Sequence, residues 1–289
     1  MFIQFLINGL ITGSIYALVS LGFALVYNTT RIFHIAYAIL YMIAPYFLMT
    51  FLIKLQISPI LSILIAISLT IIVSLATELF VYAPLVKKKS SPNVLMISSI
   101  GVMIIAINLV ALCYGNETKI INPSLSDSYK IGNIIITYNQ IIQFITSSVF
   151  IGLFMVFLKF SKFGIMTRAM RDDTELCKVF SMNVPGFRLV LFAISGLFAA
   201  IGGILTAWDF GMDPYVGMPM LLNAIVALII GGIGKFQAPV IGGLVLGVLQ
   251  ALSVLVFSAN WKDAIAFSVL VLFLLFRPQG FIGEKRRLV

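Results

Sequence analysis

Residues 2–27 read FIQFLINGLITGSIYALVSLGFALVY and contain no Asp, Glu, Lys or Arg. A helix needs about 20 mainly apolar residues to cross the hydrocarbon core of a bilayer. The run is too long for the apolar segment of a signal peptide, and no basic residue precedes it. We therefore expect the protein to retain this segment as its first membrane span.

The composition of the whole chain extends that expectation. Of the 289 residues, 61% are hydrophobic and 10% are charged, whereas soluble domains hold about 45–50% apolar and about 25% charged residues. A soluble fold of this length has no interior large enough for the excess, which lipid can solvate. We expect an all-α fold, a polytopic transmembrane helical bundle, formed as one membrane domain over residues 1–289.

Further apolar runs follow the first one. The candidate spans are residues 2–27, 34–53, 59–83, 93–114, 139–158, 187–208, 220–234, 237–258 and 263–276. Pro45 interrupts the second run, and the seventh is short and ends in Gly231, Gly232 and Gly234. We expect eight to ten membrane segments, some of them broken or re-entrant.

Lysine and arginine residues lie mainly on one side of the nine-span arrangement. Loops 84–92 and 159–188, Arg31, Lys235 and the tail from Arg277 hold 15 of the 19. Cytoplasmic loops carry such an excess, so this side is expected in the cytoplasm and the N-terminus outside. Because the bases sit in short gaps between apolar runs, the net charge of +9 indicates membrane topology and not nucleic-acid binding.

The loop at 159–186 is the one long inner loop, and residues 115–138 form a polar outer loop. Residues 165–183, IMTRAMRDDTELCKVFSMN, place apolar side chains near helical spacing with charged residues between them. The pattern predicts an amphipathic helix too polar to span, stopped by Asn183-Val-Pro185-Gly186. Such a helix can lie on the membrane surface, face a soluble partner, or only connect two spans.

The same loop carries a family resemblance. TRAMRDDTEL at 167–176, followed by Asn183-Val184, resembles the cytoplasmic loop of branched-chain amino acid ABC permeases. Four further stretches resemble that family in the same order along the chain: residues 8–18, 192–203, 231–247 and 275–283. The resemblance runs from about residue 8 to 283 and is weakest in the outer loop 115–138.

The resemblance implies a transport subunit that is not itself an enzyme, resident in the bacterial cytoplasmic (inner) membrane. It implies two ABC ATPase subunits, a second related permease in a heterodimer, and a periplasmic or lipid-anchored solute-binding protein. No cofactor is expected in this chain, which lacks a G-x-x-x-x-G-K-[ST] loop, and ATP with Mg²⁺ is expected in the ATPase partners. The residues implied to couple transport to these ATPases are Arg168, Ala169, Arg171, Asp172, Asp173, Glu175 and Leu176.

The expected solute is small and polar, a branched-chain or other amino acid. The family usually reads Asn-Phe-Ala-His-Gly-Glu after the first span, whereas residues 34–39 read HIAYAI. This departure leaves a urea or short-chain amide permease as an alternative. A secondary transporter or channel without ATP is the alternative of another class. The scarcity of carboxylates inside the spans, where Glu78 stands alone, argues against it.

Polar residues in or beside the spans are the remaining candidates. The predicted substrate path consists of Asn8, His34, Tyr37 and Asn223. The predicted docking residues for the solute-binding protein are Asp209 and Asp213. Each has a structural alternative, since polar side chains also join helices by hydrogen bonds. Glu78 is expected to reach water or Lys87.

One sequence pattern occurs twice. Gly9-Leu10-x-x-Gly13-x-x-x-Ala17-Leu18 recurs at residues 243–252. Transporters are often built from internal repeats, although chance similarity in a Gly- and Leu-rich chain remains open. In either case, glycines four residues apart allow helices to approach closely.

Overall fold

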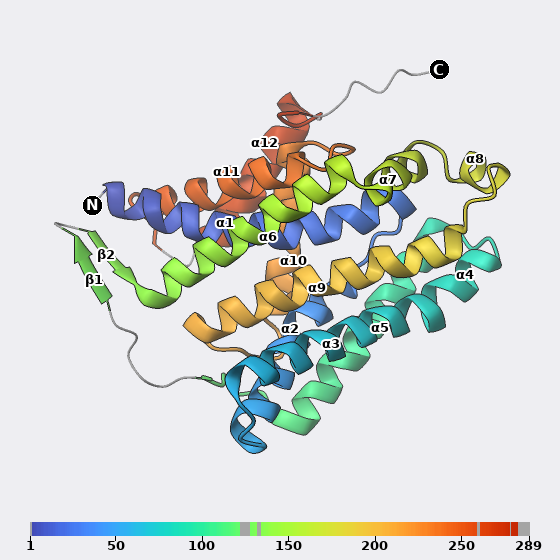
Figure 1. The fold of residues 1–289 in the computed structure, drawn as a ribbon. Coiled ribbons are helices and arrows are strands. Elements are labelled where there is room, and N and C mark those ends of the chain that lie inside the picture. The colour runs from blue at the N-terminus through green and yellow to red at the C-terminus, as the bar shows by residue number, and fades with distance from the viewer. Residues whose placement is uncertain (1, 122–127, 132–133, 259–260, 278, 283–289) are drawn as a thin grey trace. The chain divides into compact units, whose positions relative to one another are not determined.

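The computed structural model describes residues 2–121, 128–131, 134–258, 261–277 and 279–282 (Figure 1). Part of the predicted outer loop 115–138 and the end of the basic tail lie outside these residues. The chain divides into two compact units. Unit 1 comprises Met1–Ala24, Pro123–Phe157 and Leu222–Val289, and unit 2 comprises Leu25–Asn122 and Leu158–Leu221.

Unit 2 is built around three packed helices, α2 (Tyr37–Met49), α3 (Pro59–Thr77) and α9 (Val184–Phe210), which contact one another (Figure 1). Gly203 permits the closest approach, since a Cβ there would lie 2.0 Å from the carbonyl oxygen of Tyr41. Two π-helical turns extend the first two helices, η1 (Thr50–Lys54) and η2 (Glu78–Tyr82). The unit also holds α4 (Ala83–Lys87), α5 (Pro92–Tyr114), α7 (Lys162–Asp172) and α8 (Thr174–Val179).

Unit 1 contains most of α1 (Phe2–Thr30), α6 (Tyr138–Phe160) and α10 (Gly217–Gly231), with all of α11 (Ala238–Ser253) and α12 (Lys262–Phe276). A hairpin of β1 (Ser128–Ile131) and β2 (Ile134–Thr137) precedes α6. The side-chain amide of Gln4 pairs in both directions with the backbone of Ile135, at 2.8 Å each way. This amide therefore ties the hairpin to the first turn of α1.

The two copies of the repeated glycine pattern pack against each other. A Cβ on Gly247 would lie 2.4 Å from the Cα of Gly13, and one on Gly243 would lie 2.4 Å from the nitrogen of Ala17. Gly9 faces Val248 in the same way. Rising numbers on α1 meet falling numbers on α11, so the helices are antiparallel. The prediction that these glycines serve close helix packing is confirmed.

Six helical segments are long and apolar enough to cross a membrane within the described part of the chain: Phe2–Thr30, Tyr37–Lys54, Pro59–Lys87, Pro92–Tyr114, Tyr138–Phe160 and Val184–Phe210. Helices α10 and α11 are apolar but shorter, with 15 and 16 residues. The count of eight to ten membrane segments is therefore not confirmed. Pro45 lies inside α2 without ending it, whereas α10 stops at Gly231, before Gly232 at φ +116°.

Candidate functional site

The inner loop forms two helices where the sequence predicted one over residues 165–183. Asp173 separates them with an extended backbone (φ −154°, ψ 108°). Its carboxylate accepts hydrogen bonds from the backbone N–H groups of Glu175 and Leu176, at 2.8 and 3.0 Å. Asp is a preferred N-cap residue because it satisfies donors that a helix start leaves unpaired. Asp173 therefore begins α8, and the one-helix prediction was wrong at this point.

Helix α7 is held in unit 2 by its own side chains. Ser161 caps it by accepting from the N–H of Gly164 at 3.2 Å, and Met170 is buried. Arg168 donates to the carbonyl of Leu158 at 3.0 Å, and Arg171 pairs with the neighbouring Asp172 at 2.8 Å. Of the two arginines predicted to contact an ATPase, Arg168 thus bonds to the end of α6 and Arg171 bonds within the loop.

Helix α8 presents an apolar surface instead. Leu176, Val179 and Phe180 are 52%, 77% and 73% exposed. Beside them, Glu175 and Lys178 form an exposed ion pair at 2.6 Å, which adds little stability because solvent screens it. We call Leu176, Val179 and Phe180 the α8 apolar surface. The predicted residue Ala169 is half-buried on α7 and does not share it.

A buried ion pair joins the start of α9 to the end of α3. The Arg188 guanidinium donates from Nε to Glu78 Oε1 at 2.7 Å and from Nη2 to Oε2 at 3.0 Å. The two side chains are 10% and 3% exposed. The sequence prediction that Glu78 reaches water or Lys87 was wrong, because folding brings a residue 110 positions away into bidentate contact.

The π-helical turn η2 also carries Tyr82, which anchors a second buried network. His34 Nδ1 lies 2.8 Å from the Tyr82 hydroxyl, which donates to Ser99 Oγ at 2.6 Å. Ser99 Oγ also accepts from the backbone N–H of Ala36 at 2.7 Å. With Tyr82 donating to Ser99, His34 carries its proton on Nδ1, and Nε2 has no partner among the described residues. Burial lowers the pKa of His34 to about 3, so the ring is neutral at physiological pH.

The four residues predicted for the substrate path are divided between the two units. His34 and Tyr37 belong to unit 2, where both are fully buried with ring centroids 5.9 Å apart. Asn8 and Asn223 belong to unit 1. Asn8 accepts a hydrogen bond from Gln4 at 3.2 Å, and the buried Asn223 accepts one from Gln250 at 3.1 Å.

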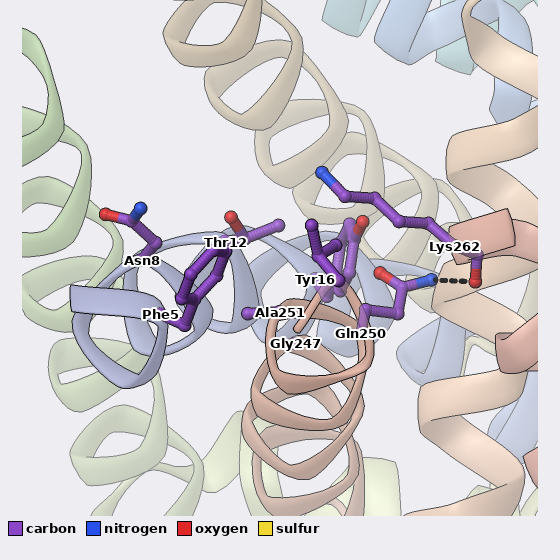
Figure 2. A pocket seen from close by; sticks show the side chains of 9 residues that line it. Phe5, Asn8, Thr12, Tyr16, Gly247, Gln250, Ala251 and Lys262 are labelled. Atoms are coloured by element: carbon purple, nitrogen blue, oxygen red, sulfur yellow. Dashed lines mark hydrogen bonds between the residues drawn. The ribbon is translucent and has the colours of Figure 1, made fainter. Parts of the chain in front are cut away.

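Unit 1 contains a pocket of about 120 Å³ with a mainly apolar lining, shown in Figure 2. Its lining comes from α1, from α11 with the residue that follows it, and from the first residue of α12: Phe5, Asn8, Thr12, Tyr16, Gly247, Gln250, Ala251, Val254 and Lys262. Asn8 is the one predicted path residue among them. The sequence could have indicated Thr12 and Tyr16 as well, because they follow Asn8 at intervals of four residues. This spacing places the three polar side chains along one face of an otherwise apolar helix.

The residues predicted to dock a binding protein lie at and just after the end of α9. Asp213 accepts a hydrogen bond from the N–H of Tyr215 at 2.8 Å, and Asp209 is half-buried in the last turn of the helix. The backbones of Lys119 and Met212 pair in both directions at 2.8 and 2.9 Å. Asp213 thus shapes a local turn, and its role in docking stays a prediction.

Comparison with known proteins decides the family. A family model described as "Branched-chain amino acid transport system / permease component" matches residues 5–274. The chain belongs to this family. The resemblance seen in the sequence is therefore confirmed, and the protein is a multi-pass membrane permease component.

Relatives within the permease family match along nearly their whole length. The branched-chain amino acid permease BraD of Pseudomonas aeruginosa is 31% identical over 98% of this chain and 96% of its own. LivH of Salmonella typhimurium is 30% identical over the same shares, and a probable LivH of Methanocaldococcus jannaschii is 25% identical over 96% and 91%. A solved structure, PsaBC from Streptococcus pneumoniae in complex with Fab, aligns with a TM-score of 0.55 and 14% identity, covering 96% of this chain and 93% of that one. At that identity the likeness concerns the fold.

Proposed function

We propose that this chain is the membrane-spanning permease subunit of an ABC importer for branched-chain or other amino acids. The observation that carries the proposal is the α8 apolar surface on the inner loop of a chain belonging to this permease family. The ATPases, the solute-binding protein and a second permease subunit are separate chains. ATP and Mg²⁺ bind in the ATPase pair, and the complex resides in the inner membrane.

The contacts in unit 2 suggest how ATPase movement reaches the spans. Residues 180–183 alone separate α8 from α9. A push on α8 therefore acts directly on the first turn of α9, and the Arg188–Glu78 pair passes it to the end of α3. A bidentate buried pair transmits displacement because separating its charges in a medium of low dielectric is costly. Alternating access then follows from rocking these joined helices.

The alternatives lose support in this geometry. The urea or amide alternative rests on residues 34–39, and all six are at most 7% exposed in the core of unit 2. Their departure from the family pattern thus changes packing. A secondary transporter needs a titratable carboxylate along its path. Apart from Asp263, the first residue of the last predicted span, Glu78 is the one acidic residue inside the predicted spans, and it is paired with Arg188.

The test uses an Asp substitution on the α8 apolar surface. Val179→Asp places a carboxylate where an ATPase would cover it, and an unpaired charge in an interface costs about 2–5 kcal/mol. We expect copurification of the ATPase subunits and ATP-dependent amino acid uptake in proteoliposomes to fall at least tenfold. Val86→Asp is the matched control, since Val86 is also exposed, at 38%, on the predicted cytoplasmic side. Unchanged uptake and copurification in Val179→Asp would refute the proposal.

A further inference from the structure

The pocket in unit 1 has a polar side and an apolar side. Helix α1 supplies Phe5, Asn8, Thr12 and Tyr16 at intervals of three and four residues, so that they share one face. Helix α11 supplies Gly247, Gln250 and Ala251, and Val254 follows its last residue. Polar groups in membrane helices are costly next to lipid and tend to face protein or a water-filled cavity. The stripe on α1 follows that rule.

The amide of Gln250 is fixed before any ligand arrives. It is 3% exposed, and its nitrogen donates to Asn223 Oδ1 at 3.1 Å and to the carbonyl oxygen of Lys262 at 3.3 Å. The side-chain carbonyl oxygen of Gln250 points away from the Lys262 carbonyl (Figure 2). Both amide protons are thus occupied, and the oxygen is left as an acceptor for a ligand donor.

Lys262 supplies the charge of the pocket. It is the one residue with a charged side chain among the lining residues, and it forms no salt bridge within the described part of the chain. It stands at the first residue of α12, where a helix dipole disfavours a cation by about 0.3–1 kcal/mol. Asp263 follows it, exposed and outside the pocket lining. In Figure 2 the ammonium group extends back toward the α1 side of the pocket. An anionic ligand would pair with the ammonium group of Lys262 and would also interact favourably with the N-terminal end of the α12 dipole.

We propose that this pocket binds the zwitterionic head of the transported amino acid, with its carboxylate on the ammonium group of Lys262. The choice of an amino acid rests on the proposed function. Asn8 and Thr12 supply neutral donors for the carboxylate, and the Gln250 oxygen accepts from the ligand ammonium group. A charge-assisted bond of this kind is about twice as strong as a neutral one. Phe5, Ala251 and Val254 leave an apolar wall for an aliphatic side chain.

The size of the pocket restricts the ligand. About 120 Å³ matches an amino acid head with a short aliphatic chain. On the predicted topology, the first turns of α1 and the start of α12 lie at the outer face. The pocket would then receive the solute early in its passage, near where a binding protein delivers it.

The test measures binding to the intact complex in nanodiscs by saturation-transfer difference NMR. The probes are L-leucine, 4-methylpentanoate, which lacks the amine, and 3-methylbutylamine, which lacks the carboxylate. We expect leucine and 4-methylpentanoate to give saturation-transfer signals with the wild-type complex, and Lys262→Met to reduce these signals at least fivefold. Any signal from 3-methylbutylamine should be the same with wild type and with Lys262→Met. Lys130→Met is the matched control, because Lys130 is exposed in the same unit.

Further arms separate the possible outcomes. Thr12→Val removes a neutral hydrogen-bond donor and leaves the charge of the pocket unchanged. We expect this variant to weaken leucine binding about threefold. If phosphatidylglycerol nanodiscs suppress the leucine signal and phosphatidylcholine nanodiscs do not, the site belongs to a lipid phosphate and the inference is overturned. If the wild-type complex imports leucine while Lys262→Met binds it normally, the inference fails and the proposed function stands. If neither uptake nor binding of any amino acid occurs, both fail.

Discussion

The buried Glu78–Arg188 pair gives the sharpest prediction about stability. Replacing either partner alone, by Glu78→Met or Arg188→Met, leaves the other charge in a site where the side chains are 10% and 3% exposed. Removing one member of a buried pair costs about 3–5 kcal/mol, because the remaining charge is desolvated without a partner. We expect each single variant to lose about that much free energy of unfolding.

The double variant Glu78→Met/Arg188→Met separates the charge effect from a packing effect. Replacing both members of a buried pair with apolar residues of similar volume is often neutral or stabilising by about 1–4 kcal/mol. The double variant should therefore be at least 2 kcal/mol, roughly, more stable than either single variant. Reversible unfolding in bicelles measures the free energy of unfolding of the wild type, the two single variants and the double variant, which together form a double-mutant cycle.

An exposed pair serves as the control for this cycle. Glu175 and Lys178 are 81% and 53% exposed, so Glu175→Met should change stability by less than about 1 kcal/mol. The reasoning fails if the single variants at the buried pair cost no more than this control. It also fails if the double variant loses the sum of the two single losses, since the pair would then contribute only packing.

Two further predictions concern the helix seam and the buried histidine. A Cβ on Gly247 would lie 2.4 Å from the Cα of Gly13, so Gly247→Ala should lower the free energy of unfolding by about 1–3 kcal/mol. A Cβ on Gly152 would meet no atom within 4 Å, so Gly152→Ala should raise the free energy of unfolding by up to about 1 kcal/mol in the same assay. The pKa of His34 is about 3 when folded and near its ordinary value of 6.5 when unfolded, so the unfolded chain binds the extra proton between these values. Stability should therefore fall by up to about 1.4 kcal/mol per pH unit as pH drops from 6.5 toward 3. Melting temperatures of wild type and His34→Gln, measured between pH 6.5 and pH 3, test this prediction. The prediction is wrong if the melting temperatures of the two proteins fall equally with pH.

Much of the architecture follows from local rules that act within a few residues. Apolar runs predict every long membrane helix because lipid selects for them over a length of about 20 residues. Gly231 and Gly232 end α10 as expected from the seventh run, since Gly232 adopts a positive φ that glycine tolerates. The paired glycine patterns also indicated close packing before their partners were known.

The break at Asp173 marks the limit of periodicity. Apolar spacing over 165–183 fits one helix, but Asp173 caps a new one. A capping preference of about 1 kcal/mol competes there with helix continuation. The residue type could have signalled the break, because Asp173-Thr174 follows a charged Asp172 in the middle of the pattern.

The sequence by itself determined that this protein lives in the bilayer, where its long apolar helices lie along the chain, and which family it belongs to. Only the tertiary structure decided that Glu78 pairs with Arg188, that His34 joins Tyr82 and Ser99, and that Lys262 meets the polar stripe of α1. Helix formation depends on neighbours three and four residues away. A buried polar group, in contrast, takes whichever partner the packing of distant helices brings within about 3 Å, and no local pattern encodes that choice.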